Sequence, residues 1–227
     1  MSTTIPAQAD APAGDTLAPQ RVEALPRVSR LIGPGALGLG AVLAAAGMAL
    51  HLESMPEDER LIQAMVDDRS WTASHVLLGI GFALFAIGAA HAATVIRGRG
   101  TVLTGVGAVL ISLGGVLMAL SDFAHGALNV ALRGQVDNAE SLDIHLSYFE
   151  QPAVAGMNIG PMLLTLGMLA LGAGLLRSRS VPRWAGATVL ATPIAVNASF
   201  ALSLPSYLQA LPFLVDMLVL TGLMTRR

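Results

Sequence analysis

The sequence of 227 residues contains no cysteine and no lysine, and only 12% of its residues are charged. Without cysteine, the chain cannot form a disulfide, a thiolate metal site, an Fe–S cluster or a cysteine nucleophile. It also has no nucleotide-binding motif and no basic patch of the kind that binds nucleic acid. These absences argue against nucleic acid as a partner and against ATP-driven transport by this chain alone.

Long apolar stretches dominate what is present, with 54% hydrophobic residues and a mean hydropathy of +0.66. A bilayer core about 30 Å thick requires roughly 20 apolar residues per helix. The stretches that meet this length are 31–50, 72–96, 101–121, 152–176, 185–203 and 206–224. We therefore predict an all-α transmembrane bundle of six spans in one domain, residues 30–227. Residues 1–29 lack apolar periodicity and are predicted to form a disordered cytoplasmic tail.

The positive charges predict the orientation of these spans. All 13 basic residues are arginine, and ten of them cluster before the first span, after the second, after the fourth and after the last. These ten are Arg21, Arg27, Arg30, Arg97, Arg99, Arg177, Arg179, Arg183, Arg226 and Arg227. The other three share the alternate loops with eleven carboxylates. This positive-inside pattern predicts a multi-pass cell-membrane protein with both termini in the cytoplasm. The lack of lysine beside abundant Ala, Gly, Leu and Arg is typical of a high-GC bacterial genome.

Polar residues gather at the predicted outer ends of the first three spans and in the outer loop that follows them. They are His51, His75, Asp122, His125 and His145. Imidazole and carboxylate groups are common ligands of zinc, copper and iron, so this set is a candidate site for a metal or a haem. Asp122 could instead orient His75 or His125 within a polar pocket. A third interpretation is that these residues are simply solvated at a wet interface.

Two further polar residues lie deeper in the predicted bundle. His91 follows His75 by 16 residues, which places it about 24 Å further along the same helix. No other span offers a histidine at that inner level, which disfavours a two-haem cytochrome. Asp216 falls near the middle of the sixth span, where an ionised carboxylate is costly and often functional. With Asn158 and Asn197 it forms a candidate proton relay, or else an interhelical hydrogen bond.

Glycines recur seven residues apart in the first four spans. The pairs are Gly40 and Gly47, Gly81 and Gly88, Gly107 and Gly114, and Gly160 and Gly167. Small residues on one face let helices approach closely in lipid. The pattern indicates ordinary packing within the bundle, and the alternative is a face for a homo-oligomer or another membrane protein.

The segment from about residue 55 to 131 resembles a poorly characterised family of actinobacterial multipass membrane proteins. The resemblance rests on an acidic loop leading to Trp71 and His75, then an Arg-Gly-Arg-Gly turn at 97–100, and then a span ending at Asp122. It implies membership of a membrane family without an established activity, and therefore no mechanism.

Three classes of function remain open at this point. We favour an accessory or interaction membrane protein with an outer-face His/Asp pocket, because no strong catalytic motif is present. The alternatives are a membrane-embedded enzyme or redox protein using the outer histidines, and a small proton-coupled transporter using Asp216.

Overall fold

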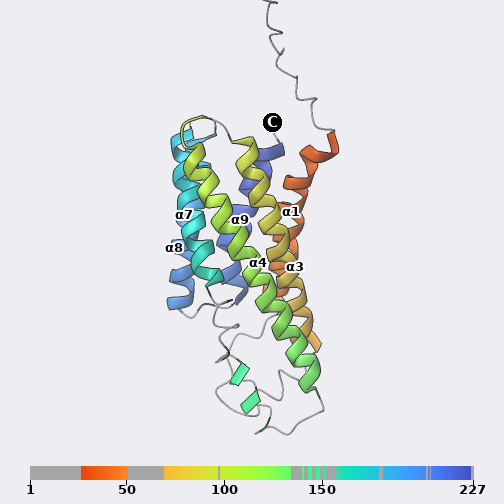
Figure 1. The fold of residues 1–227 in the computed structure, drawn as a ribbon. Helices are drawn as coiled ribbons and strands as arrows, with labels where there is room; N and C mark the ends of the chain where they lie inside the picture. The colour runs from red at the N-terminus through yellow and green to blue at the C-terminus, as the bar shows by residue number, and fades with distance from the viewer. Residues whose placement is uncertain are drawn as a thin grey trace, which may run out of the picture.

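The computed structural model is all-helical in the part of the chain that it describes (Figure 1). Described are residues 27–50, 69–96, 98–133, 140, 143–144, 147–148, 151, 157, 159–178, 181–202, 204 and 206–225. The helices are α1 (Arg27–Leu50), α3 (Arg69–Val95), α4 (Thr101–Leu132), α7 (Gly160–Ser178), α8 (Arg183–Ala201) and α9 (Ser206–Thr225).

The six helices form a closed ring. Each packs against the next along the chain, and α9 packs against α1. The α3–α4 turn is tight because Gly98 and Gly100 adopt positive φ values of 90° and 94°, a region in which glycine has no steric penalty. This turn lies at the same end of the bundle as the C-terminus (Figure 1).

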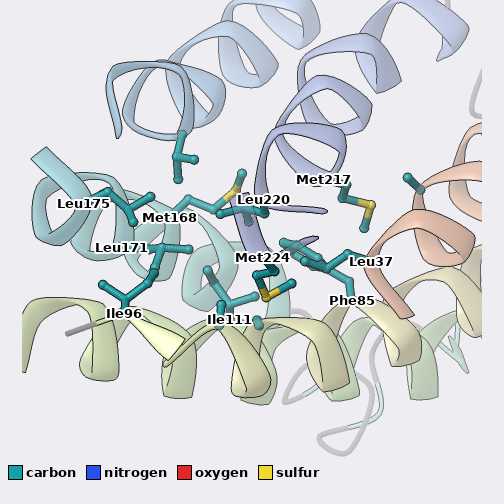
Figure 2. Packing of buried hydrophobic residues seen from close by; sticks show 14 of the residues in the cluster. Leu37, Phe85, Ile96, Ile111, Met168, Leu171, Leu175, Met217, Leu220 and Met224 are labelled. Atoms are coloured by element: carbon teal, nitrogen blue, oxygen red, sulfur yellow. The ribbon is translucent and has the colours of Figure 1, made fainter. Parts of the chain in front are cut away.

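Apolar side chains from all six helices fill the middle of the ring. Figure 2 shows several of them pointing from neighbouring helices toward one another, including Leu37 of α1, Phe85 of α3, Ile111 of α4, Leu171 of α7 and Met217 of α9. Val189 of α8 belongs to the same buried cluster. Unlike a water-soluble bundle, this one also has many large apolar side chains on its outside, among them Val102, Val109 and Ile194. An apolar exterior of this kind suits a lipid environment.

Five of the helices are long and apolar enough to cross a membrane: α1, α3, α4, α7 and α9. The all-helical class predicted from the sequence is thus confirmed, and the five apolar helices are consistent with the predicted membrane protein. The fifth predicted span, 185–203, corresponds to α8, which has 19 residues but is not among those five. Six crossings and cytoplasmic termini stay predictions.

The largest difference from the predicted boundaries is at the end of α4. The sequence predicted a span ending at Ser121, followed by a loop, whereas the helix continues for eleven more residues to Leu132. Helix α4 therefore has 32 residues and is about 48 Å long, well beyond a bilayer core of about 30 Å. Hydropathy indicates where a helix leaves the lipid, but α4 continues as a helix beyond that point.

The fourth span also differs from its prediction. Helix α7 begins at Gly160 and not at residue 152, and Pro161 lies in its first turn. Proline is well tolerated there, because the first backbone N–H groups of a helix have no intrahelical acceptor. The tail at residues 1–26 lies outside the described residues, while 27–29 already belong to α1.

Candidate functional site

The candidate outer site, at the end of the bundle that the sequence predicts to face outward, is built around a pair of side chains on neighbouring helices. His75 of α3 and Asp122 of α4 approach to 3.1 Å between Nδ1 and Oδ1. Both side chains are buried, with 7% and 11% of their surface exposed. Asp122 occupies one face of α4 together with His125 and Asn129, three and seven residues further along. Gly126 on the same stretch faces the backbone of Thr72 and the Cβ of His75, where an added Cβ would make ordinary van der Waals contacts.

Aromatic rings surround this pair in a column. His75 stacks on His125 with 5.3 Å between ring centroids and 15° between ring planes. Trp71, one turn earlier on α3, meets His75 edge-on at 4.9 Å. Tyr148 meets His125 edge-on at 5.4 Å, and burial raises the pKa of Tyr148 above its ordinary value of 10.0. Three candidate residues from the sequence, His75, Asp122 and His125, are therefore in direct contact.

The hydrogen bonds orient both imidazole rings. The Nδ1 of His125 lies 2.8 Å from the carbonyl oxygen of Ser121, and because a carbonyl only accepts, Nδ1 must carry a proton. In the same way, an ionised Asp122 accepts from the Nδ1–H of His75, which makes Nε2 the basic nitrogen of the neutral ring. A histidine oriented by a carboxylate in this manner can act as a proton acceptor or as a metal ligand.

Three buried polar atoms around the pair have no hydrogen-bond partner among the described residues. They are the Oδ2 of Asp122, the Nδ2 of Asn129 and the Oγ of Ser74. Ser74 is fully buried and Asn129 is 2% exposed. Buried polar groups are nearly always hydrogen-bonded in native proteins, so each of these atoms marks a place where a ligand, a water or a partner group would bind.

A further contact fixes the two helix ends against each other. Arg133, at the C-terminal end of α4, donates from Nη2 to the Oγ1 of Thr72 at 3.0 Å. Since Thr72 is in the first turn of α3, this bond closes the outer side of the site.

Among the residues that the structure describes, no three His, Asp or Glu side chains are grouped so as to hold a metal ion. His51 and His145, the other two candidates from the sequence, lie outside the described residues.

The relay proposed for Asp216, Asn158 and Asn197 stays a prediction. Asp216 is fully buried in α9, and neither of its carboxyl oxygens has a hydrogen-bond partner within the described part of the chain. The neighbouring Thr192 of α8 donates to the carbonyls of Thr188 and Pro212. The Asn197 side chain is exposed and donates to the carbonyl oxygen of Pro193 on its own helix at 2.7 Å. Asn158 lies outside the described side chains.

His91 is at the other end of α3 from His75, as its position in the sequence implies. Its ring lies against Gly33 of α1, where a larger residue would collide with it. It therefore takes part in packing between α1 and α3.

Sequence reasoning missed several residues of the outer site. Asn129 was not considered, although its distance of seven residues from Asp122 places both on one helix face. Ser74, Thr72 and Arg133 carry no comparable pattern in the sequence, and only the packing of α3 on α4 reveals them.

No protein-family model matches the chain, and no curated protein and no solved structure is significantly similar to it.

Proposed function

We propose that the chain is a multi-pass protein of a bacterial cell membrane that acts as an accessory subunit of a membrane assembly. In this proposal it has six spans and both termini in the cytoplasm. The site at the outer ends of α3 and α4 receives a polar group from the partner. That partner is another membrane protein or a second copy of this chain.

One observation carries the proposal: two buried groups on the same face of α4 without a partner among the described residues. The Oδ2 of Asp122 is an acceptor and the Nδ2 of Asn129 is a donor. A side-chain or backbone amide from a partner would satisfy both. An unsatisfied buried polar group costs about 1–3 kcal/mol, so completing both hydrogen bonds would stabilise the assembly.

Replacing Asn129 with leucine tests this idea without undermining the fold. Asn129→Leu removes the donor but keeps a side chain of similar length, and it deletes a buried polar group that has no partner in the described structure. We expect the variant to fold but no longer to bind the other subunits of the membrane assembly. Asn197→Leu is the matched control, because the amide of Asn197 is bonded within its own helix and exposed.

The measurement is the mobility of the tagged chain, expressed at its native level, on native gels of solubilised membranes. Wild type and Asn197→Leu should run in a discrete complex heavier than the purified chain, and Asn129→Leu should run with the purified chain. Wild type running with the purified chain, or Asn129→Leu staying in the complex, would contradict the proposal.

An enzyme or a metal- or haem-binding redox protein is the second candidate, and the orientation of His75 by Asp122 favours it. Metal analysis and a visible absorption spectrum of the purified protein distinguish this second candidate from the accessory subunit. A stoichiometric metal or a haem band that is lost in His75→Ala would establish the second candidate. The third candidate function is a proton-coupled transporter, which the burial of the Asp216 carboxyl supports.

A further inference from the structure

The end of the bundle that carries the C-terminus has a basic hollow between two interhelical turns. Its volume is about 440 Å³, and it is lined by Arg99, Gly100, Leu176, Arg177 and Arg183. Arg99 comes from the α3–α4 turn, while Arg177 and Arg183 flank the α7–α8 turn. All three arginines are exposed. The fold thus brings together three guanidinium groups that lie up to 84 residues apart in the sequence.

Along the sequence, the two turns that carry these arginines are far from acidic residues. No Asp or Glu occurs between Asp68 and Asp122 or between Glu150 and Asp216, and both turns fall within these segments. Among the described residues, no carboxylate pairs with these three guanidinium groups, so their hydrogen-bonding capacity is available to an external anion. Guanidinium binds phosphate with two parallel hydrogen bonds, which makes arginine the preferred residue for such sites.

A second, more apolar hollow adjoins the first. It shares Gly100 and Arg177 with the basic hollow and is otherwise lined by Gly98, Thr101, Val102 and Leu103. Val102 is 79% exposed, and Val106 and Val109 continue the same apolar surface along α4. The phosphate-binding groups therefore sit directly beside a surface that faces acyl chains in a membrane.

Trp184 marks the depth of this region. It follows Arg183 directly and is 57% exposed. Exposed tryptophan is typical of the headgroup level of a bilayer. The basic hollow is thus placed where lipid phosphates lie.

We propose that this hollow binds the phosphate of an anionic phospholipid, with Arg99, Arg177 and Arg183 around the headgroup and an acyl chain along Val102 and Val106. Basic pockets between transmembrane helices bind acidic headgroups in this way. The proposal does not depend on the outer site or on the orientation of the chain in the membrane.

Trp184 provides the readout. Trp71 is the only other tryptophan, so a Trp71→Phe background leaves Trp184 as the sole indole. The full chain is placed in bilayer nanodiscs in which 10% of the lipid carries brominated acyl chains, either as phosphatidylglycerol or as phosphatidylcholine. Bromine quenches indole fluorescence on contact, so the excess quenching by the anionic lipid measures its enrichment at the hollow.

Wild type in this background should be quenched more by brominated phosphatidylglycerol than random mixing allows. Each of Arg99→Gln, Arg177→Gln and Arg183→Gln should reduce the apparent affinity about fivefold, since one arginine near a membrane surface contributes about 1 kcal/mol. Arg69→Gln, at the other end of the bundle, removes the same charge and should change nothing. A circular-dichroism melt of each variant shows that it is folded.

Two results would overturn the assignment. The first is equal quenching by the two lipids in the wild type. The second is full displacement of the brominated lipid by inorganic phosphate at constant ionic strength, because the site would then take the free anion without need of acyl chains. The assignment is supported if the brominated lipid stays bound when inorganic phosphate is added.

Discussion

At the scale of single residues, His75 is held from three sides by groups with different chemistry. Asp122 binds its Nδ1, His125 stacks on one face of its ring, and Trp71 meets it edge-on. Because the side chains of His75 and Asp122 are buried together, removing one takes this hydrogen bond from the other in a poorly solvated place. Their contributions to stability should therefore depend on each other.

A double-mutant cycle measures this dependence. We expect His75→Ala and Asp122→Ala each to lower the free energy of unfolding by about 1–3 kcal/mol, as for a buried hydrogen-bonded group that loses its partner. The double variant should cost less than the sum, with a coupling energy of about 1–3 kcal/mol. Reversible unfolding of the purified chain in mixed micelles supplies the values. Additive losses would mean that the 3.1 Å contact contributes nothing to stability.

Asp216 presents the opposite case, a buried carboxyl without a hydrogen-bond partner among the described residues. Asp216→Asn keeps the size of the side chain and its hydrogen-bonding capacity, but the amide cannot exchange a proton. As an accessory subunit, the chain should tolerate this change, with its melting temperature and its native assembly close to those of wild type. The proton-coupled transporter would be favoured if a folded Asp216→Asn protein no longer supported the cellular function of the wild type while the Asn129→Leu protein still did.

The sequence predicts part of the outer site because depth in a membrane can be counted along a helix. His75 and Asp122 fall at the same level on consecutive helices, and consecutive helices are usually neighbours. Counting cannot give rotation about the helix axis, which decides whether a side chain faces a neighbour or the lipid. For that reason Asn197 was grouped with Asp216, although its side chain is exposed.

At the scale of helices, glycine sets how closely α4 and α7 pack. A Cβ atom at Gly107 would lie 2.7 Å from the carbonyl oxygen of Gly167, and one at Gly114 would lie 2.8 Å from that of Gly160. Two of the glycine pairs seen in the sequence thus face each other across a single interface. Between α1 and α3, Gly40 is close to the carbonyl of Gly81, whereas Gly47 packs against Ser74 and Leu78 and Gly88 packs against Leu37. Assembly with a second chain stays a prediction.

Gly107→Ala should therefore force the two backbones apart. Overpacking of this kind costs about 1–3 kcal/mol, and here the obstructing atoms are backbone and cannot rotate away. Gly105→Ala on the same helix is the control, because a Cβ there meets nothing within 4 Å. Thermal unfolding should show a lowered melting temperature for Gly107→Ala only. Equal melting temperatures would show that α4 and α7 can separate without cost.

Helix α8, the fifth predicted span, is less apolar than the other five helices. Its polar side chains mostly bond to carbonyls of the helix itself: Thr188 to Trp184, Asn197 to Pro193 and Ser199 to Val196. Such bonds satisfy polar groups locally, which is how serine and threonine are accommodated in transmembrane helices. A hydropathy scale counts these residues as polar whether or not they are hydrogen-bonded within the helix. It therefore underestimates how well α8 suits a bilayer.

At the scale of the whole molecule, chain direction gives a second reason to expect that α8 crosses. Helices α7 and α9 both end at the side of the bundle where the C-terminus lies (Figure 1). If both of these apolar helices span the membrane in the same direction, the chain must return between them. The returning segment is α8, whose 19 residues extend about 28 Å.

Single cysteines test this arrangement without background, because the chain has none of its own. Pro182 and Leu202 are exposed residues at the two ends of α8, and Gln151 and Thr225 are exposed near the predicted outer and inner sides. With a membrane-impermeant thiol reagent on intact cells, Leu202→Cys and Gln151→Cys should be labelled. Pro182→Cys and Thr225→Cys should react only after the membrane is opened. Labelling of Pro182→Cys from outside would reverse the orientation, and protection of Leu202→Cys beside a labelled Gln151→Cys would show that α8 does not cross.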